Sequence, residues 1–441
     1  MKAFNDFILF RDRHRLYMPQ QLQKQLLEDG VVEEQLNSIV ESYKKVAPGA
    51  DGLRIVGLPD MHPGYSFPIG TVVAMPLEGG FIAPEGVGYD INCGVRVLRT
   101  NLTYEQIASK LNSIISEMHE FIPSGTRRSS LRLSQAQMKA VLSRGIAGLV
   151  GTEMRTQDGR DSVTALHESV DAYEKVEDFG SLETGVDEFS QKQLGRGIAM
   201  FGTLGGGNHY LEIERVAEVY EEGSLCVGDV LVFIHCGSRS LGHEICRSHA
   251  TGDLFIPIES DSGQAYFGQM KAAANYAYAN REAISAMALR VLRNHIPEAE
   301  VEILSDCGHN IARIETVGGK EWLIHRKGAS RAKPGDLVGV GGSMATSSYV
   351  LRGCDGAEAT FHSTAHGSGR LVRRSEARRI FSVSSVLNSM AGIELRTGSI
   401  PGVVEEAASC YKDVNAVVDH CERVGISRKV AKTVPIAVIK G

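Results

Sequence analysis

The sequence lacks the features that mark secreted proteins, membrane proteins and disulfide-rich scaffolds. Its eight cysteines include no CxxC pair, which argues against a disulfide framework or a structural zinc ribbon. The longest apolar runs, such as Val230–Ile234, are far shorter than the roughly 20 residues that a membrane span needs. Charged residues interrupt the N-terminal segment, residues 1–17, so it has no signal-peptide core. We therefore expect a cytoplasmic protein that does not contact a membrane.

Linkers, low-complexity tracts and repeats of solenoid period are also missing from the 441 residues. A composition of 43% hydrophobic and 23% charged residues is ordinary for a globular protein with a large core. We therefore expect one large domain, residues 1–441. The net charge of −6 argues against general binding of nucleic acid. However, five arginines fall between Arg370 and Arg379, so a local basic face on an acidic protein is compatible with the sequence.

Hydrophobic periodicity predicts a mixture of helices and strands that do not alternate regularly. Helical spacing of Leu, Ile and Ala covers residues 18–45, 104–118, 264–292 and 403–424. Short runs typical of strands cover residues 53–58, 70–75, 95–98, 230–235, 301–304, 322–325 and 337–340. No GxGxxG motif opens a βαβ unit. The pattern favours a mixed α+β domain over a Rossmann or TIM fold.

The 48 glycines cluster beside His, Cys, Asp and Asn instead of forming flexible linkers. Glycine allows tight turns and a close approach of the backbone to a ligand. The recurrence of glycine beside metal-ligand residue types predicts an active site built from several Gly-rich loops around a central metal site.

Five residues in these loops are candidate metal ligands. Asp90 and Cys93 lie three apart in a Gly-flanked turn, and His209, His235 and His309 each lie in a separate Gly-containing segment. Taken singly, a buried cysteine or a core histidine is the commoner interpretation. Together they form a metal-ligand set that is too large for one catalytic zinc, which favours two ions bridged by the Cys93 thiolate. Ligand softness alone favours zinc.

Other Gly-rich segments have the composition of phosphate-binding loops. Three consecutive glycines, residues 205–207, within the segment 202–212 indicate either a turn that cradles phosphate or a simple hairpin. Gly, Ser and Thr tracts at 341–349 and 363–370 suit phosphates or a purine edge, and His366, among small residues, suits a nucleophile. Residues 325–327, His-Arg-Lys, are expected to form a cationic loop for a triphosphate or an RNA end.

These motifs resemble those of the RtcB family of RNA-splicing ligases along nearly the whole chain. The matching segments are LPDMHPGYSFPIG (58–70), GVGYDINCGVR (86–96), GTLGGGNHYLEI (202–213), HCGSRSLGH (235–243), AAANYAYANR (272–281), GHNIARIE (308–315), HRKGASRA (325–332), GGSMATSSYVL (341–351), HGSGR (366–370) and PIAVIKG (435–441). So many long motifs in one order are highly specific. Two places depart from the family pattern: Gly341 stands where many members have Pro, and residues 122–130 replace a stretch that is usually richer in Gly, which leaves recognition of the substrate end open.

The resemblance implies a role for each candidate. One manganese ion would be bound by Asp90, Cys93 and His209, and a second by Cys93, His235 and His309, in place of the zinc suggested by softness. His366 would be the histidine that is guanylylated. The positions implied to hold GTP are Asn208, His209, Glu212, His309, Asn310, Gly341, Gly342, Ser343, Met344, Ser348, His366, Gly367, Ser368, Gly369 and Lys440.

The implied activity is ligation of an RNA 3′-phosphate or 2′,3′-cyclic phosphate end to a 5′-hydroxyl end, through guanylylated histidine and an RNA-ppG intermediate. Its expected partners are RNA ends and GTP, with an archease-like activator as an open alternative. Repair of damaged rRNA or tRNA and guanylyl capping of DNA 3′-phosphate ends remain alternatives within the family. A metallohydrolase that uses the same ions without nucleotide, and a non-catalytic RNA-binding paralogue, are alternatives from other classes.

The sequence also predicts that the last residues of the chain are buried near the site. The run Ile436–Ile439 is too apolar to be left in water, so we expect it to be buried. Burial would carry Lys440 to a fixed position, and the resemblance implies that its ammonium faces the O6 atom of guanine.

Overall fold

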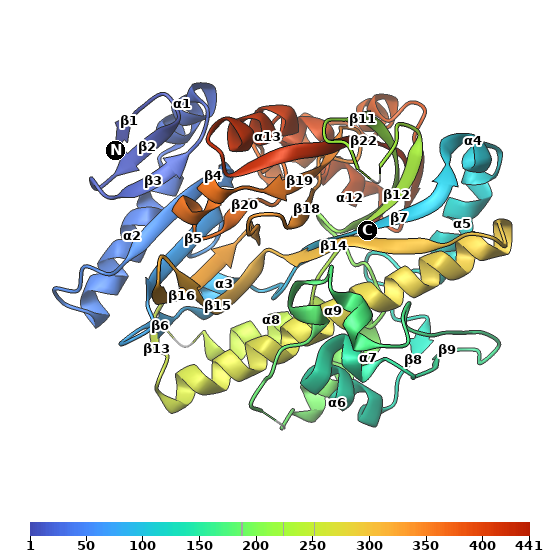
Figure 1. The fold of residues 1–441 in the computed structure, drawn as a ribbon, viewed down its shortest axis with the longest axis horizontal. Helices are drawn as coiled ribbons and strands as arrows, with labels where there is room; N and C mark the ends of the chain where they lie inside the picture. The colour runs from blue at the N-terminus through green and yellow to red at the C-terminus, as the bar shows by residue number, and fades with distance from the viewer. Residues whose placement is uncertain (187, 224, 251) are drawn as a thin grey trace.

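The computed structural model describes residues 1–186, 188–223, 225–250 and 252–441. Two large β-sheets form its centre, and helices cover them on both sides (Figure 1). Seven strands form the N-terminal sheet, in the order β1 (Lys2–Ala3), β2 (Phe7–Phe10), β3 (His14–Tyr17), β4 (Arg54–His62), β5 (Ile69–Pro76), β16 (Lys320–Lys327) and β15 (Asn310–Val317).

The eight-stranded central sheet is formed by segments from most of the chain. Its order is β14 (Val301–Gly308), β7 (Gly94–Thr103), β12 (Asp229–Cys236), β11 (Tyr210–Val219), β22 (Ser427–Lys440), β19 (Ser348–Gly353) and β18 (Leu337–Val340), with β21 (Glu394–Thr397) parallel to β22. The neighbours along this path are antiparallel. Smaller pairings involve β6 (Phe81–Ile82), β8 (Leu131–Arg132), β9 (Met154–Thr156), β10 (Ser162–Val163), β13 (Ile256–Pro257), β17 (Ala329–Arg331) and β20 (Ser363–Ala365).

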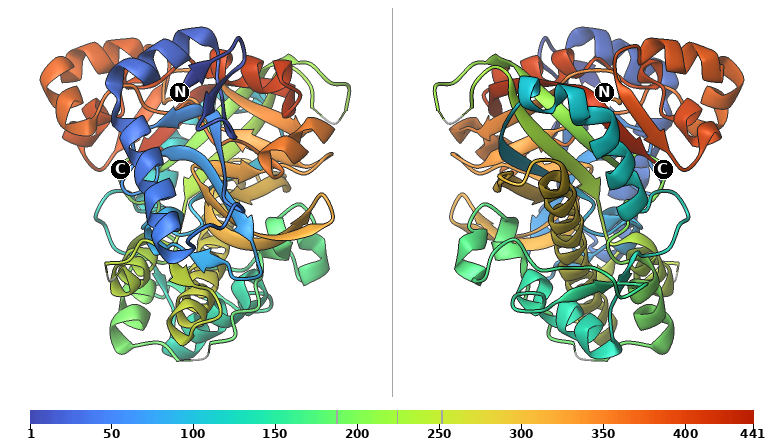
Figure 2. Two further views of the ribbon diagram at one scale, coloured as in Figure 1. Left: turned by 90° about the vertical axis from the view of Figure 1, so that its left-hand side faces the viewer. Right: turned by 90° about the vertical axis from the view of Figure 1, so that its right-hand side faces the viewer.

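Helix α9 (Asp261–His295) is the longest helix among the described residues, and it lies against the sheets as a core element. The Ser260 hydroxyl accepts a hydrogen bond from Gly263 N at its start, and its many alanines have high helix propensity. Between Ala272 and Ala288 every side chain is buried, as expected for a helix enclosed on all sides. Figures 1 and 2 show α9 between the sheets and a layer formed by α6 (Gln135–Arg144), α7 (Gln191–Met200) and α8 (Arg239–His249).

The other helices correct two expectations from the sequence. The stretch 18–45 forms two helices, because Gly30 adopts a left-handed conformation with φ of 68° between them. The stretch 403–424 is likewise divided by a segment without α-helix. The remaining helices are α1 (Gln20–Asp29), α2 (Val31–Val46), α3 (Pro84–Val87), α4 (Tyr104–Ile107), α5 (Leu111–Phe121), α10 (Arg374–Ile380), α11 (Val383–Ser389), α12 (Ile400–Glu405) and α13 (Val414–Arg423).

The largest hydrophobic cluster contains residues from Ile8 to Ile439, so distant parts of the chain share one core. This confirms the expected single mixed α/β domain. Each predicted strand run lies within a strand, except that Leu53 precedes β4. Ile436–Ile439 is buried in β22, as predicted. The expected cationic loop at 325–327 is wrong, because these residues pair with both neighbours inside β16. No helix in the described part of the chain combines the length and apolar character needed to cross a membrane.

Candidate metal and nucleotide site

The five candidate ligands come together because their strands are neighbours in the central sheet. Asp90 and Cys93 lie in the loop before β7, His209 directly precedes β11, His235 ends β12, and His309 follows β14. The register brings these ends together. His235 on β12 pairs with Val95 on β7 and with Tyr210 on β11, and Cys307 on β14 also pairs with Val95. Residues that are up to more than 200 positions apart in the sequence therefore lie together at one end of these neighbouring strands.

The ligand atoms form two groups that share Cys93. Cys93 with His235 and His309 is one group, Asp90 with Cys93 and His209 is the other, and the ligand atoms of each lie within 4.8 Å of one another. Cys93 Sγ is 3.3 Å from His209 Nε2 and 3.2 Å from His235 Nε2. His235 Nε2 is 3.2 Å from His309 Nε2. Each group thus offers the set of three that the sequence predicted.

Outer contacts orient two of the imidazoles. His209 Nδ1 lies 2.8 Å from the Leu204 carbonyl oxygen, and His235 Nδ1 lies 3.0 Å from that of Asn208. A ring N–H that donates to each carbonyl leaves Nε2 free to act as a ligand. Carbonyl contacts of this kind are typical of metal-binding histidines.

The charges of the site fit cations. Burial, followed by Asp90, raises the pKa of the Cys93 thiol well above its ordinary value, so a thiolate there requires a nearby positive charge. Burial lowers the pKa of both His235 and His309, which keeps these rings neutral and able to coordinate. Burial opposes ionisation of Asp90, but His209 brings its pKa down to about 2. The donor set can therefore hold two divalent ions with Cys93 between them.

Arg281 on α9 stabilises the loops that carry the candidate ligands. Its guanidinium donates to the carbonyl oxygens of Asn92 and Cys236, each at 2.9 Å, and these residues are adjacent to Cys93 and His235. Asp306 accepts hydrogen bonds from both Arg281 and Arg96, at 2.8 Å each. All three side chains of this ion-pair network are fully buried.

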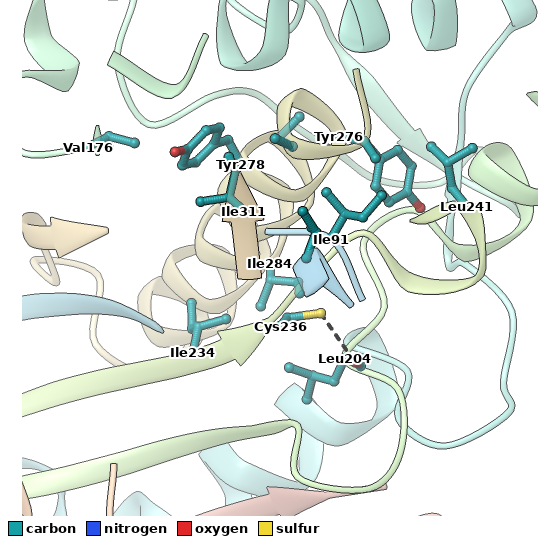
Figure 3. Close-up of a cluster of buried hydrophobic side chains, with 14 of the residues drawn as sticks. Ile91, Val176, Leu204, Ile234, Cys236, Leu241, Tyr276, Tyr278, Ile284 and Ile311 are labelled. Atoms are coloured by element: carbon teal, nitrogen blue, oxygen red, sulfur yellow. Dashed lines mark hydrogen bonds between the residues drawn. The ribbon is translucent and has the colours of Figure 1, made fainter. Parts of the chain in front are cut away.

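A packed apolar cluster fixes the same loops from another direction (Figure 3). Ile91 from the Asp90–Cys93 loop, Ile234 and Cys236 from β12, and Leu204 are completely buried in it. The Cys236 thiol donates to Leu204 O at 3.1 Å, and this carbonyl is the one that contacts His209. Cys236 therefore has a packing role, although it is next to a candidate ligand.

The candidate nucleophile is held by an aspartate that sequence reasoning did not single out. His366 Nδ1 lies 2.5 Å from Asp60 Oδ2, and His366 N donates to the same oxygen at 3.0 Å. Asp60 is completely buried. Burial opposes its ionisation, but His366 holds its pKa below the ordinary value. The His366 ring centroid is 4.7 Å from that of His309, so the candidate nucleophile is adjacent to the candidate ligand cluster.

Lys412 holds the backbone on either side of Asp60 in place. Its ammonium donates to the carbonyl oxygens of Pro59, at 3.1 Å, and of Met61, the two residues that flank Asp60. Burial lowers the pKa of Lys412 to about 8, although Asp60 opposes the shift. Gly369 packs directly against the Asp60 backbone with φ of 73°, where a Cβ atom would collide with the Asp60 carbonyl.

A cavity of about 1090 Å³ connects these residues. Most of the predicted nucleotide positions line it: Asn208, His309, Asn310, Gly341, Gly342, Ser343, Met344, His366, Gly367, Ser368, Gly369 and Lys440. Asp90, Cys93 and His235 line it as well. The cavity thus joins the candidate ligand cluster, the candidate nucleophile and the Gly-rich loops, and it is large enough for a nucleotide.

Three predicted residues do not line this cavity. Ser348 lies behind the Gly341–Met344 loop, where its hydroxyl accepts from Gly342 N at 3.2 Å. Glu212 is buried on β11, and burial followed by Glu214 raises its pKa well above the ordinary value. His209 faces the ligand cluster. These positions contact the cavity walls and not the open space.

Lys440 reaches the cavity at the end of β22, as predicted. Its ammonium is 3.7 Å from Glu406 Oε2 and 5.4 Å from the centroid of the Tyr210 ring. Burial lowers its pKa, and Glu406 opposes that shift. Glu406 is 1% exposed and also pairs with Arg370 at 3.2 Å and Arg374 at 3.3 Å. This carboxylate is a second residue that the sequence did not point out.

The arginine cluster is only partly free. Arg370 donates to Tyr411 Oη and Glu405 O in addition to Glu406, and Arg378 pairs with Glu405 at 2.6 Å. No ion pair involves Arg373 or Arg379 among the residues that the structure describes, and Arg373 lines the cavity. The basic face therefore depends mainly on Arg373 and Arg374, which line the cavity, and we predict that these two arginines contact RNA phosphates.

Comparison with known proteins assigns the chain to a family. The family model described as tRNA-splicing ligase RtcB matches residues 47–441. The chain belongs to the RtcB family. It is 36% identical to the tRNA-splicing ligase RtcB of Thermococcus kodakarensis over 97% of this chain and 94% of the relative. It is also 37% identical to RNA-splicing ligase RtcB homolog 1 of Entamoeba histolytica, covering 92% and 84% of the two chains. The RNA-splicing ligase RtcB of Mycobacterium tuberculosis is 36% identical, with 87% and 96% covered.

A weak signal for the missed carboxylates was present in the sequence. Asp60 interrupts the apolar run Ile55–Met61 of strand β4, where a buried carboxylate needs a partner. The partner, His366, is 306 positions away, so no local spacing connects the two. Glu406 stands beside Glu405 at the end of α12, and nothing in that segment indicates which of them is buried.

Proposed function

We propose that this RNA ligase uses GTP and two manganese ions to join an RNA 3′-phosphate, or a 2′,3′-cyclic phosphate after its opening, to a 5′-hydroxyl end. The observation that carries the proposal is the His366–Asp60 pair at the wall of a nucleotide-sized cavity, beside the Cys93-centred cluster. A hydrolase that uses the same ions would need no oriented histidine nucleophile of this kind.

The proposed first step is transfer of GMP to His366. Nε2 attacks the α-phosphorus of GTP, a P–N bond forms, and the bond to pyrophosphate breaks. Asp60 accepts the Nδ1 proton in a hydrogen bond, which keeps Nε2 unprotonated for attack and stabilises the cation that develops on the ring. Lys412 and the Gly369 contact hold Asp60 in place.

The next two steps use the same cavity. The RNA 3′-phosphate attacks the phosphorus on His366, so that the P–N bond breaks and an RNA-ppG end forms. The 5′-hydroxyl then attacks the RNA phosphorus and GMP leaves. The Gly341–Met344 and His366–Gly369 segments offer backbone N–H groups and hydroxyls for phosphate, and Lys440 would recognise guanine. When bound, the two ions would neutralise phosphate charge during these steps.

Manganese is proposed from the resemblance, and it competes with the zinc that the Cys and His donors favour. Asp90, Cys93 and His209 would hold one ion, and Cys93, His235 and His309 the other. Metal analysis after purification with each ion, combined with activity, decides between the two metals.

The test is incubation of the purified protein with manganese and α-labelled GTP, with and without RNA that has 3′-phosphate and 5′-hydroxyl ends. We expect a covalent GMP adduct that is labile in acid and stable in base, together with RNA joining. His366→Ala should lose the adduct, whereas His362→Ala, a nearby histidine that does not line the cavity, should keep it. Label retained by His366→Ala would refute the assignment. Label passed to a DNA 3′-phosphate end and not to RNA would favour the DNA-capping alternative.

A further inference from the structure

The mouth of the cavity has an exposed aromatic side chain that the proposed chemistry does not use. Tyr65 is 76% exposed, more than any other large apolar or aromatic side chain in the described part of the chain. It lines the same cavity as His366 and Asp90. A single exposed apolar side chain needs no explanation. Its place on the rim of this cavity, and the rigidity of its loop, set Tyr65 apart.

Hydrogen bonds hold the backbone on either side of Tyr65 in place. Gly64 N donates to Gln35 Oε1 at 3.2 Å, and the Gln35 amide donates to Gly64 O at 2.7 Å and to Tyr65 O. The Ser66 hydroxyl donates to Glu85, and Phe67 is completely buried. The loop therefore holds its backbone in place while the Tyr65 ring projects into solvent.

A second aromatic ring supports the first. The Tyr65 and Tyr89 centroids are 5.8 Å apart with an angle of 87° between the rings, and Tyr89 in turn lies 4.7 Å from the His243 ring. Such an edge-to-face contact uses at most one face of a ring, so Tyr65 keeps a face open to solvent. Tyr89 directly precedes Asp90, which links the aromatic pair to the ligand cluster.

We propose that Tyr65, supported by Tyr89, is a stacking site for the nucleobase of a single-stranded RNA end that enters the cavity. Aromatic side chains bind unpaired bases by stacking without requiring a particular base, which suits an enzyme that must accept varied ends. Lys327, whose ammonium donates to Glu85 O at 2.9 Å, lines the same cavity and offers positive charge for the RNA phosphates. The inference rests on the proposed RNA ligase activity only for the identity of the substrate.

The test is equilibrium binding and needs no catalysis. Fluorescence anisotropy with manganese and without GTP gives the Kd of short single-stranded RNAs that have a 5′-hydroxyl or a 3′-phosphate end. Each RNA is prepared with its natural terminal nucleotide and with an abasic one. We expect Tyr65→Ala to weaken binding of at least one natural end by about 5- to 100-fold, the range for loss of one stacked base. Tyr65→Phe should bind normally, because the ring is retained.

The abasic RNA makes the test specific. In the wild-type protein it should bind as weakly as natural RNA binds to Tyr65→Ala, and the two losses should not add. Tyr220→Ala removes another exposed tyrosine, 45% exposed and outside the cavity, and should bind like the wild type. Equal affinities for wild type and Tyr65→Ala, or additive losses, would overturn the proposal. Failure of GMP transfer to His366 would refute the proposed function and leave this binding result standing.

Discussion

The two halves of the cavity are held by different kinds of structure. The ligand half, Asp90 to His309, lies at strand ends of one sheet, with ring nitrogens against backbone carbonyls and Arg281 beneath. The nucleotide half depends on two buried carboxylates, Asp60 for His366 and Glu406 for Lys440. Sheet register thus sets the first half, and a few long-range ion pairs set the second. Substitutions in the ligand half should affect metal content and fold, whereas those in the nucleotide half should alter chemistry with the fold intact.

The largest effect is expected from Cys93→Ala, because the thiol belongs to both ligand groups. We expect bound metal to fall from two ions to fewer than one per chain and guanylylation to fall below detection. Elemental analysis and adduct formation measure the two effects. Cys226→Ala, which removes an exposed cysteine, is the control and should retain both. Two tightly bound ions in Cys93→Ala would contradict a bridging role.

Asp60→Asn tests the other half. The substitution keeps the shape but offers an amide that can donate to Nδ1, which would place the ring proton on Nε2 and block attack. We expect guanylylation to slow by about 100-fold or more, with metal content and melting temperature nearly unchanged. Single-turnover labelling with GTP measures the rate. A variant that lost its metal together with its activity would show that the two halves are not separable.

Arg281→Met should affect the ligand half through the fold. It removes the donors to Asn92 O and Cys236 O and leaves part of the Asp306 charge unpaired in the core. Loss of one partner of a buried pair costs about 3–5 kcal/mol, so we expect a lower melting temperature together with weaker metal binding. Arg290→Met, on the exposed side of the same helix, should change neither by much. Normal metal affinity in Arg281→Met would limit this arginine to a general packing role.

The sequence predicted the two halves unequally. The ligand half was predictable because Cys, His and Asp beside glycine are chemically distinctive, even though their pairing depends on sheet register. The predicted strand at 95–98 is part of β7, the strand through which that register runs. Helix and strand content followed from periodicity, with three exceptions. Gly30 divides one predicted helix, a segment without α-helix divides the stretch 403–424, and residues 325–327 continue a strand.

The nucleotide half depended on contacts that no local pattern contains. His366 and Lys440 were recognisable, but their carboxylate partners lie 306 and 34 positions away along the chain. Arg370 belongs to the arginine cluster that the sequence offered as a local basic face, and in the structure Glu406 and Tyr411 already engage it. Such long-range choices are made by packing, which composition and spacing do not specify.

Lys440→Ala should have an intermediate effect and should separate recognition from the fold. Glu406 keeps Arg370 and Arg374 as partners, so its buried carboxylate remains paired. The protein should therefore stay folded and retain its metal. Loss of the proposed charged hydrogen bond from Lys440 to the guanine O6 should reduce the preference for GTP over ATP by about 10-fold or more. Lys432→Ala, on the same strand and outside the cavity, is the matched control. Labelling with each nucleotide measures the preference, and an unaltered ratio would make the tail purely structural.

The smallest effect is expected where the nucleotide half meets solvent. Replacing Arg373 and Arg374 with glutamine should weaken RNA binding several-fold, because both are exposed beside the cavity and would neutralise phosphates. The salt dependence is the sharper measurement. For single-stranded RNA the slope of log K against log salt should flatten by about 0.7 unit for each RNA phosphate that the variant no longer neutralises. The same change of charge at Arg155 and Arg160, on the distant β9–β10 hairpin, controls for the overall field of the protein. An equal flattening of the slope in both double variants would assign the effect to net charge. An unchanged slope in the Arg373 and Arg374 variant would show that the start of α10 is only a solvated surface. A decrease confined to this variant would extend the nucleotide half of the site out to the RNA backbone.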